Sequence, residues 1–340
     1  MTASGRKILI TGGAGFIGSN FIRYWILHHP QDRLINFDAL TYAGNPDNLK
    51  SVEDHPQYSF IKGDITDSVG VRKAMQGTDI VVHFAAETHV DRSISGPSIF
   101  CRTNTLGVQT MLEAAREVGV KKFIHISTDE VFGSLKLNDQ KKFKESTPYA
   151  PSSPYAASKA GGDMLVQSYW KTYNFPGVIT HCGNNFGPYQ YPEKFIPLMI
   201  INALQGKALP IYGDGKYIRD WIHVEDHVRA IEAVVERGRI GEHYCIGGEP
   251  KMNFEVARRI LKILGKGEDL LQFVKDRPGH DRKYVLDSAK VKRELKWSPL
   301  HTFEERLQNT IEWYQDNQVW WRALMNKKYR EYYRRQYRAS

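Results

Sequence analysis

Short apolar runs alternate with longer amphipathic stretches over the first half of the chain. Apolar and β-branched runs predict strands at residues 7–11, 34–37, 58–62, 80–84, 122–127 and 177–181. Helical spacing predicts helices at residues 16–28, 68–75, 98–118 and 154–173. The run Ile80-Val81-Val82 is apolar without a break, which is typical of a strand covered on both faces. The pattern predicts an α/β fold with a Rossmann-type, doubly wound parallel sheet.

The pattern of predicted elements and loops changes after about residue 182. Helices and short strands are now separated by loops rich in Pro and Gly, at residues 187–188, 212–215, 247–248 and 277–279. We therefore expect a larger Rossmann domain over residues 1–182 and a smaller α/β substrate-binding domain over residues 183–340. A segment around residues 213–240 is expected to return to the larger domain.

The net charge of +9 is concentrated at the C-terminus. From Arg322 onward, seven Lys and Arg residues face the single Glu331, so a tail over residues 322–340 holds +6 of the total. Basic residues interleaved with tyrosines can bind single-stranded nucleic acid. Because the rest of the chain carries only +3, we favour a helical tail whose tyrosines pack on the body while its arginines stay in solvent. We expect no nucleic-acid partner.

Several classes of protein are disfavoured by the composition. No stretch approaches the roughly 18 apolar residues that a membrane span needs, and the apolar run near the N-terminus is too short for a signal peptide. We expect a cytoplasmic protein with no membrane partner. Cys101, Cys182 and Cys245 are far apart and form no Cys-x-x-Cys pair, so we expect neither a disulfide framework nor a metal site.

A glycine-rich turn follows the first predicted strand and opens a helix. Gly12, Gly15 and Gly18 are spaced three apart, with Phe16 and Ile17 at the helix start. This spacing allows a tight turn, close backbone approach to a pyrophosphate, and phosphates on the helix N-terminus. Asp38 ends the second strand, where a carboxylate accepts hydrogen bonds from a ribose diol and repels a 2′-phosphate. The motif therefore predicts NAD rather than NADP as cofactor.

Further cofactor contacts are expected after the next two strands. Asp64 and Ile65 follow the third strand, and Asp64 is placed to face the adenine, although a turn or N-cap role fits it equally well. Ala85 and Ala86 follow the fourth strand, where small residues let a cofactor lie close to the backbone.

Tyr155 and Lys159 are four residues apart on a predicted helix and so share one face. A phenol titrates near 10 in water, and a neighbouring ammonium lowers that pKa by stabilising the phenolate. Downstream of a dinucleotide motif, this pair resembles the catalytic pair of the short-chain dehydrogenase/reductase superfamily. In its extended members, a Ser or Thr ends the fifth strand, and this chain has Thr128 there. The resemblance implies oxidation of a sugar hydroxyl.

Two carboxyl groups, those of Asp129 and Glu130, come directly after Thr128. The C-terminal ends of parallel strands are where substrates bind in such sheets. A solvated acidic turn is the alternative interpretation. We favour a chemical role, because an epimerase or a simple reductase does not need two further acid and base groups beside the cofactor.

The sequence is similar to the dTDP-glucose 4,6-dehydratases over nearly the whole chain. Thr128-Asp129-Glu130 and the run Arg277–Arg282 are the most specific of the shared motifs. The other matching segments are residues 12–19, 38–45, 83–93, 127–133, 155–159, 184–185 and 219–221. Phe132 and Phe186 depart from the tyrosines usual in this family, which puts only local hydrogen bonds in doubt.

The resemblance implies a lyase reaction in three steps, in which NAD is regenerated in every cycle. Tyr155, helped by Lys159 and Thr128, removes the C4 hydroxyl proton while hydride leaves C4. Glu130 then takes the C5 proton, and Asp129 protonates the departing C6 hydroxyl. Hydride finally returns to C6, giving dTDP-4-keto-6-deoxyglucose.

The resemblance also implies the substrate site and the assembly. The residues implied to bind dTDP-glucose are Glu87, Asn184, Lys194, Arg219, Asn253 and His280. Lys194 and Arg219 suit a diphosphate, which needs charged donors, while a solvated Lys194 and a capped loop His280 are the plainer alternatives. The helices at residues 98–118 and 154–173 resemble the pair that forms a homodimer interface in this family, although they could equally belong to a monomer core.

Three other functions stay open from the sequence alone. The nearest is a dehydratase acting on a UDP-sugar, since the loops that would recognise the base are not diagnostic. A nucleotide-sugar 4-epimerase would share the oxidation step, but it has no use for Asp129 and Glu130. A non-catalytic NAD- or RNA-binding protein would have no need of Thr128, Tyr155 and Lys159.

Overall fold

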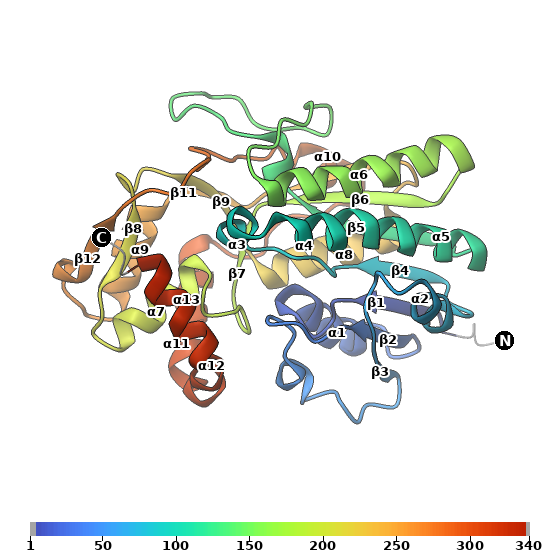
Figure 1. Cartoon of the computed structure of the whole chain (residues 1–340), viewed down its shortest axis with the longest axis horizontal. Coiled ribbons are helices and arrows are strands. Elements are labelled where there is room, and N and C mark those ends of the chain that lie inside the picture. The colour runs from blue at the N-terminus through green and yellow to red at the C-terminus, as the bar shows by residue number, and fades with distance from the viewer. Residues whose placement is uncertain (1–4, 338–340) are drawn as a thin grey trace.

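The computed structural model describes residues 5–337, and its central feature is one sheet of seven parallel strands. The strand order is β10-β6-β5-β4-β1-β2-β3, so the chain winds outward in both directions from β1 (Figure 1). The strands are β1 (Lys7–Thr11), β2 (Arg33–Asp38), β3 (Tyr58–Lys62), β4 (Ile80–His83), β5 (Lys122–Thr128), β6 (Gly177–Cys182) and β10 (His243–Ile246). The predicted doubly wound Rossmann-type fold is confirmed.

Helices cover both faces of this sheet, because successive residues of each strand point to opposite sides. On β1, Ile8 and Ile10 pack toward α1 (Phe16–His28), α8 (Val224–Arg237) and α10 (Ala289–Leu295). Leu9 packs toward the other layer. That layer consists of α2 (Ser68–Met75), α5 (Val108–Val118) and α6 (Pro154–Tyr173). The central strands β1 and β4 are therefore covered on both sides, as the uninterrupted run Ile80-Val81-Val82 indicates.

The single helix predicted over residues 98–118 is divided into several helical segments in the structure. The structure has α4 (Pro97–Cys101), a π-helical turn at Arg102–Gly107, and then α5, preceded by the short helix α3 (Val90–Ser95). A π turn adds a residue to the helical repeat and commonly marks a functional position. Here it places the Asn104 side chain, which is buried, toward the loop that follows β4.

A smaller unit lies beside the carboxyl ends of the large sheet (Figure 1). Its strands form the sheet β11-β9-β7 and the pair β12-β8. They are β7 (Asn184–Phe186), β8 (Leu209–Tyr212), β9 (Ile218–His223), β11 (Glu249–Met252) and β12 (Leu271–Val274). The helices α7 (Phe195–Leu204), α9 (Asn253–Ile263) and α11 (Phe303–Asp316) share a separate apolar core with these strands. Single turns of 3-10 helix lie at Pro46–Leu49, Asp129–Phe132 and Glu268–Leu270.

Segments beyond residue 182 return to the large sheet. The helices α8 and α10 pack on it, and β10 pairs with β6 at its edge. The division of the chain into domains at residue 182 stays a prediction. No described helix, including the twenty-residue α6, combines the length and the apolarity needed to cross a membrane.

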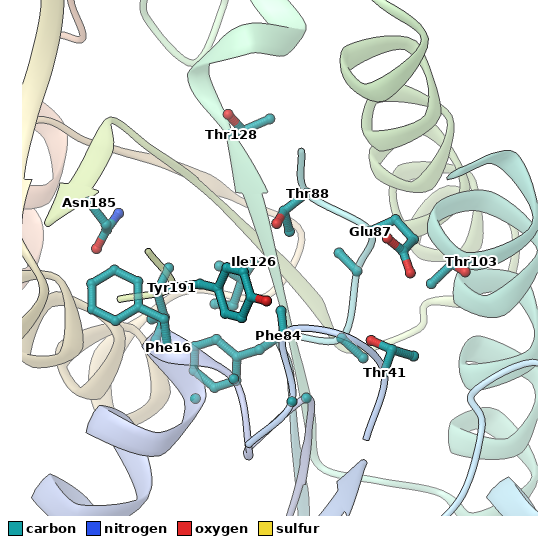
Figure 2. A pocket seen from close by; sticks show the side chains of 18 of the residues that line it. Phe16, Thr41, Phe84, Glu87, Thr88, Thr103, Ile126, Thr128, Asn185 and Tyr191 are labelled. Carbon is teal, nitrogen blue, oxygen red and sulfur yellow. The ribbon is translucent and has the colours of Figure 1, made fainter. Parts of the chain in front are cut away.

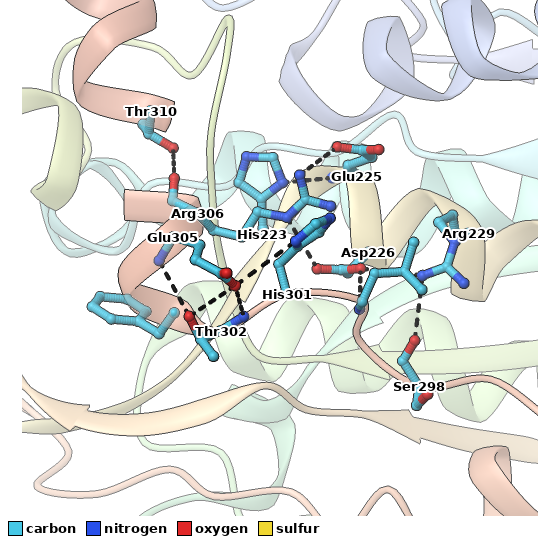
Figure 3. Close-up of polar contacts among 12 residues, drawn as sticks. His223, Glu225, Asp226, Arg229, Ser298, His301, Thr302, Glu305, Arg306 and Thr310 are labelled. Atoms are coloured by element: carbon cyan, nitrogen blue, oxygen red, sulfur yellow. Dashed lines mark hydrogen bonds and ion pairs between the residues drawn. The ribbon is translucent and has the colours of Figure 1, made fainter. Parts of the chain in front are cut away.

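A buried arginine links the smaller unit to α8. Arg306 on α11 donates from Nη1 to Glu225 Oε2 at 2.7 Å, and its Nε lies 3.5 Å from Asp226 Oδ2 (Figure 3). The start of α11 is fixed by a capping box between Thr302 and Glu305. The cap sets the position of α11, and Arg306 joins that helix to the layer that covers the large sheet.

The C-terminal tail is helical in the described part. After α12 (Gln318–Leu324), α13 (Lys327–Tyr337) packs Tyr329, Tyr333 and Tyr337 on the smaller unit. Tyr329 is buried and donates to Pro192 O, and Tyr333 OH accepts from Asn202 Nδ2 at 3.1 Å. Arg330 and Arg334 are exposed. This arrangement is the one favoured from the sequence, except that residues 338–340 of the predicted tail lie outside the described residues.

Candidate active site

A cleft opens at the carboxyl ends of the central strands, where the strand order reverses at β1. Ligands bind at this point in open α/β sheets. Figure 2 shows Thr128 at the end of its strand, with Glu87 and Thr88 to one side and Asn185 and Tyr191 to the other. Every residue predicted to be catalytic or to bind the cofactor lines this cleft: Gly12, Gly15, Phe16, Ile17, Gly18, Asp38, Asp64, Ile65, Ala85, Ala86, Thr128, Asp129, Glu130, Tyr155 and Lys159.

The glycines are required by the backbone geometry. Gly12 has a φ of +70°, and a Cβ there would lie 2.7 Å from the backbone nitrogen of Ala85. A Cβ at Gly18 would lie 2.5 Å from the carbonyl oxygen of Gly12. A side chain at Gly12 would push the turn away from the end of β4, and one at Gly18 would push α1 away from the turn. The bare backbone leaves the start of α1 open to a pyrophosphate.

Asp38 lies at the end of β2 and is 7% exposed. Its Oδ2 accepts from Ala14 N at 2.9 Å, and its Oδ1 accepts from Leu40 N at 2.8 Å. These bonds fix the carboxyl beside the glycine turn, although burial raises its pKa. A carboxylate held here fits a ribose diol and disfavours a 2′-phosphate, so the residues present suit NAD.

Asp64 takes part in a local turn at the rim of the cleft. Its Oδ1 accepts from Thr66 N at 2.8 Å and from Thr66 Oγ1 at 2.9 Å. Asp64 therefore has the turn role that the sequence left open, and it also lines the cleft beside Ile65.

Tyr155 and Lys159 lie on the first turns of α6. Ser153 caps the helix by accepting from Ala156 N, with Pro154 as the first helical residue. Both functional side chains are buried, and Lys159 Nζ donates to Ile126 O at 2.7 Å. Burial and the nearby Glu130 raise the pKa of Tyr155 well above its ordinary value, and burial lowers the pKa of Lys159. Deprotonation of Tyr155 therefore needs added positive charge.

Thr128 begins a single turn of 3-10 helix that presents the two carboxyls. Its Oγ1 donates to Asp129 Oδ1 at 3.3 Å and accepts from Glu130 N at 3.3 Å. Asp129 is 1% exposed, and its Oδ2 has no hydrogen-bond partner within the described residues. A buried carboxyl oxygen without a partner is costly unless a ligand supplies one.

The two adjacent carboxyls have different electrostatic surroundings. Burial, Glu130 and Asp220 raise the pKa of Asp129 well above its ordinary value. Burial also raises the pKa of Glu130, but Arg277, Arg219 and Lys194 oppose that rise. Asp129 is thus suited to donate a proton, and Glu130 to accept one.

The loop after β4 is clamped by the π-helical turn. Asn104 Oδ1 accepts from Glu87 N at 2.9 Å, and Asn104 Nδ2 donates to Glu87 O at 2.9 Å. The same amide donates to Ser158 Oγ on α6 at 2.9 Å. Asn104 therefore fixes the position of Glu87 relative to the helix that holds Tyr155.

A second pocket continues from this cleft into the smaller unit. Of the residues predicted to bind substrate, Asn184, Lys194, Arg219, Asn253 and His280 line it, together with Glu130. The sixth, Glu87, lines the first cleft, which Asn184 and Lys194 also share. Residues far apart in the sequence thus meet along one continuous path from the glycine turn.

The cationic side chains of this pocket are held in place by backbone oxygens. Arg219 donates from Nη1 to Ile218 O and from Nη2 to Asp281 O, both at 2.9 Å, and its guanidinium lies over the Tyr284 ring. Lys194 Nζ donates to Thr88 O at 3.0 Å. His280 stacks on Tyr217 at 3.7 Å, and its Nδ1 lies 2.7 Å from Asp276 Oδ1. Burial lowers the pKa of His280 to about 3, so this histidine is neutral.

Several lining residues were not singled out from the sequence. Arg277 pairs with Asp91, and Tyr337 of the tail also reaches this pocket. Arg277 belongs to the run shared with the resembled family, so its charge was a usable signal. Nothing in the sequence indicates that Tyr337 reaches a pocket lined by residues more than fifty positions earlier.

Phe132 and Phe186, the two departures from the family pattern, lie in apolar surroundings. The Phe132 ring stacks on Phe143 at 5.3 Å, and Phe186 packs on Phe303 at 5.2 Å. Neither lines the two pockets described above.

The known proteins that this chain resembles include sugar-nucleotide dehydratases and an epimerase. The family model described as GDP-mannose 4,6 dehydratase matches residues 9–310. A dTDP-glucose 4,6-dehydratase of Neisseria meningitidis is 49% identical, over 96% of this chain and 98% of that protein. A dTDP-glucose 4,6-dehydratase of Streptomyces venezuelae, crystallised with NAD and TYD bound, is 47% identical with a TM-score of 0.91, over 94% of this chain and 99% of that chain. A UDP-glucose 4-epimerase of Thermotoga maritima is 29% identical with a TM-score of 0.85, over 92% and 99% of the chains.

Proposed function

The chain belongs to the dTDP-glucose 4,6-dehydratases, and from this premise we propose which of its residues carry out each step. The enzyme is an NAD-dependent lyase that dehydrates dTDP-glucose to dTDP-4-keto-6-deoxyglucose. One observation supports the residue assignment above all. Thr128, Asp129 and Glu130 face the same cleft as Tyr155 and Lys159, beside a glycine turn suited to NAD. That cleft combines an oxidation site with an acid and a base.

The first step is oxidation at C4 of the sugar. When bound, NAD would supply the acceptor for the C4 hydride and the hydride donor for C6, and its positive charge would favour the Tyr155 phenolate. Tyr155 takes the proton of the C4 hydroxyl, and Thr128 orients that hydroxyl. The ammonium of Lys159 stabilises the phenolate. The burial that raises the pKa of Tyr155 also strengthens this stabilisation, since charges interact more strongly in a site of low dielectric.

The second step removes water across C5 and C6. The C4 ketone makes the C5 proton acidic, and Glu130 accepts that proton as the C6–O bond breaks. Asp129 donates its proton to the leaving hydroxyl, which departs as water. Glu130 returns its proton to C5 when hydride reaches C6. The unpartnered Oδ2 of Asp129, and a pKa that rises further at Asp129 than at Glu130, support this division.

Substrate binding is assigned to the pocket in the smaller unit. Lys194 and Arg219 are suited to the diphosphate, because an anion needs charged donors held in place. Glu87, Asn184, Asn253 and His280 complete the set of residues proposed to contact the nucleotide-sugar. Asn184 Oδ1 and Asn253 Oδ1 are buried without a partner within the described residues, which supports a ligand there.

We further propose a cytoplasmic homodimer. Exposed apolar side chains gather on the outer helices, with Ile99 on α4 at 48% exposure, Leu106 on the π-helical turn at 54% and Met164 on α6 at 55%. A second copy of the chain would bury them. The test is sedimentation velocity of L106R, which should shift the enzyme to monomers; an unchanged sedimentation coefficient would refute this interface. The location is proposed because NAD and nucleotide-sugars are cytoplasmic metabolites.

The direct test incubates the purified protein separately with dTDP-glucose and with UDP-glucose. Mass spectrometry should show loss of one water from dTDP-glucose, and the product should carry a C4 ketone. Loss of water from UDP-glucose alone would support the UDP-sugar dehydratase instead. An inverted C4 hydroxyl with no loss of water would indicate an epimerase.

A further inference from the structure

A buried carboxylate lies behind the catalytic pair on the same helix. Asp163 follows Lys159 by four residues and Tyr155 by eight, so all three side chains lie on one side of α6. Asp163 is fully buried, with an exposed fraction of 0%. The steps assigned above make no use of it. Burying a charged carboxylate costs free energy, so we expect Asp163 to have a role in the site.

The partners of Asp163 come from the two strands beneath α6. Its Oδ2 accepts from Ser127 Oγ at 2.8 Å and lies 3.1 Å from His181 Nε2. Its Oδ1 lies 3.2 Å from His125 Nε2. Next to these groups, His83 stacks on His125 at 5.4 Å, and Tyr149 OH lies 3.0 Å from His181 Nε2. The carboxylate thus sits among donors that belong to imidazoles and hydroxyls.

His125 and His83, two of the imidazoles around Asp163, supply no charge of their own. Burial would raise the pKa of Asp163, but His125 and His181, which face its two oxygens, outweigh that effect and hold the pKa well below its usual range. Burial lowers the pKa of His125 to about 4, and it lowers the pKa of His83 as well. Both imidazoles are therefore neutral near pH 7, and the negative charge of Asp163 is not cancelled by them.

Lys159 is the buried cation nearest to this anion along the helix. No carboxylate lies within 4 Å of its Nζ in the part of the chain that the structure describes. The groups that face Lys159 are Tyr155 on its own helix, His83 on β4, His125 on β5 and Cys182 on β6. Among Asp163 and these four neighbours, only Asp163 is a permanent anion. It offsets part of the cost of burying the ammonium.

We propose that Asp163 is a positioning residue that keeps the Lys159 ammonium charged while Tyr155 takes the proton of the C4 hydroxyl. This inference rests on the proposed function, because it assigns Asp163 a role in the C4 oxidation. Without the anion, Lys159 would lose its proton more easily. At a pH where Lys159 is neutral, the Tyr155 phenolate would lack the stabilising charge of that ammonium.

The test is the pH dependence of hydride transfer, followed as NADH absorbance in a single turnover of dTDP-glucose. D163N keeps the size of the side chain and removes its charge. Its alkaline limb, set by Lys159, should move to lower pH by about one pH unit, because the ammonium loses the anion that stabilises it. Its acid limb, set by Tyr155, should not move to higher pH, since Lys159 is still charged there and loss of an anion favours the phenolate. D163E restores the charge and should move the alkaline limb back toward that of the wild type.

Y149F is the matched control, because it removes a hydroxyl from the same network and leaves Asp163 in place. Its limbs should coincide with those of the wild type. If D163N is slower at all pH values while its limbs stay in place, Asp163 is only structural and the inference is overturned. Failure of the wild type to reduce NAD would instead refute the proposed function.

A second measurement does not depend on the folding of D163N. The wild-type enzyme with NAD is labelled with 13C at the lysine ε-carbons, and the Lys159 signal is assigned by its loss in K159R. The inference predicts a charged Lys159 across the whole pH range in which the enzyme is active. A neutral Lys159 within that range would overturn it.

Discussion

Asp129 and Glu130 are neighbours in the chain, yet Arg277, Arg219 and Lys194 together oppose the pKa rise at Glu130, whereas Arg219 opposes the larger rise at Asp129. The Glu130 carboxyl faces Arg277, Arg219 and Lys194, whereas Asp129 is buried beside Asp220. Two identical functional groups on one turn are therefore suited to opposite protonation states. The predictions for the elimination step follow from this difference.

Replacing Glu130 by Gln should separate oxidation from elimination. The amide cannot accept the C5 proton, so E130Q should reduce its bound NAD with dTDP-glucose and then stop. Turnover should fall by about 10²-fold or more. Stopped-flow absorbance of NADH, together with mass spectrometry of the sugar, checks this. If no NADH appears in E130Q, the assignment of Glu130 to the second step is wrong.

Replacing Asp129 by Asn should produce a different block. D129N lacks the acid for the C6 hydroxyl but keeps Glu130, so the C5 proton should exchange with solvent in D2O while water loss is slow. In E130Q that exchange should be absent. Equal exchange in the two variants would show that the roles of acid and base have been assigned incorrectly.

The elimination step should also fail at alkaline pH. Asp129 must be protonated to donate, so the rate of water loss is full below its raised pKa and falls as the pH rises through it. The measurement is water loss from the NADH-bound intermediate as a function of pH. A rate that stays constant far into the alkaline range would contradict a donor role for Asp129.

The tail helix should contribute to substrate binding. Tyr337 lines the pocket that holds Arg219 and His280, and its ring lies 6.0 Å from that of Tyr212. Y337A should raise the KM for dTDP-glucose about three- to tenfold, the usual effect of removing an aromatic contact, with kcat nearly unchanged. V319A, at a position 87% exposed on α12, is the control and should leave the KM unchanged. An unchanged KM in Y337A would exclude the tail from the site.

The link between the two units should be a major source of stability. R306A leaves Asp226 with one ion-pair partner fewer in a buried position, so the free energy of unfolding should fall by about 3 kcal/mol. R259A removes an exposed ion pair with Glu304 and should cost about 0.5 kcal/mol. Urea unfolding followed by tryptophan fluorescence compares them. Equal losses in the two variants would show that Arg306 acts as a surface charge.

Much of the larger unit could be predicted from residue patterns. The bounds of β1, β3, α1, α2 and α6 match those expected, and side-chain caps mark the start of two of these helices, Asp67 for α2 and Ser153 for α6. The π-helical turn at Arg102–Gly107 could not be predicted, since one added residue leaves no mark in the hydrophobic pattern. β10 is four residues long and joins the sheet from a distant part of the chain, so no local signal places it there.

Some residues of the candidate site could be predicted from the sequence, and others could not. Gly12, Asp38, Tyr155 and Lys159 belong to motifs with fixed spacing, so local sequence is sufficient to identify them. The ionised Asp163 lies within that same helix, but His125 and His181, which face its carboxylate, come from separate strands. Tertiary packing alone brings these groups together, and the charge that they leave on Asp163 is visible only in the folded chain.

The central claim is that hydride removed from C4 returns to C6 of the same sugar. The measurement uses dTDP-glucose carrying deuterium at C4, with the product analysed by NMR and mass spectrometry. The account predicts a 4-keto-6-deoxy product that has lost one water and retains the deuterium at C6, with NAD unchanged after turnover. Deuterium appearing in released NADH or in solvent, with none at C6, would contradict it.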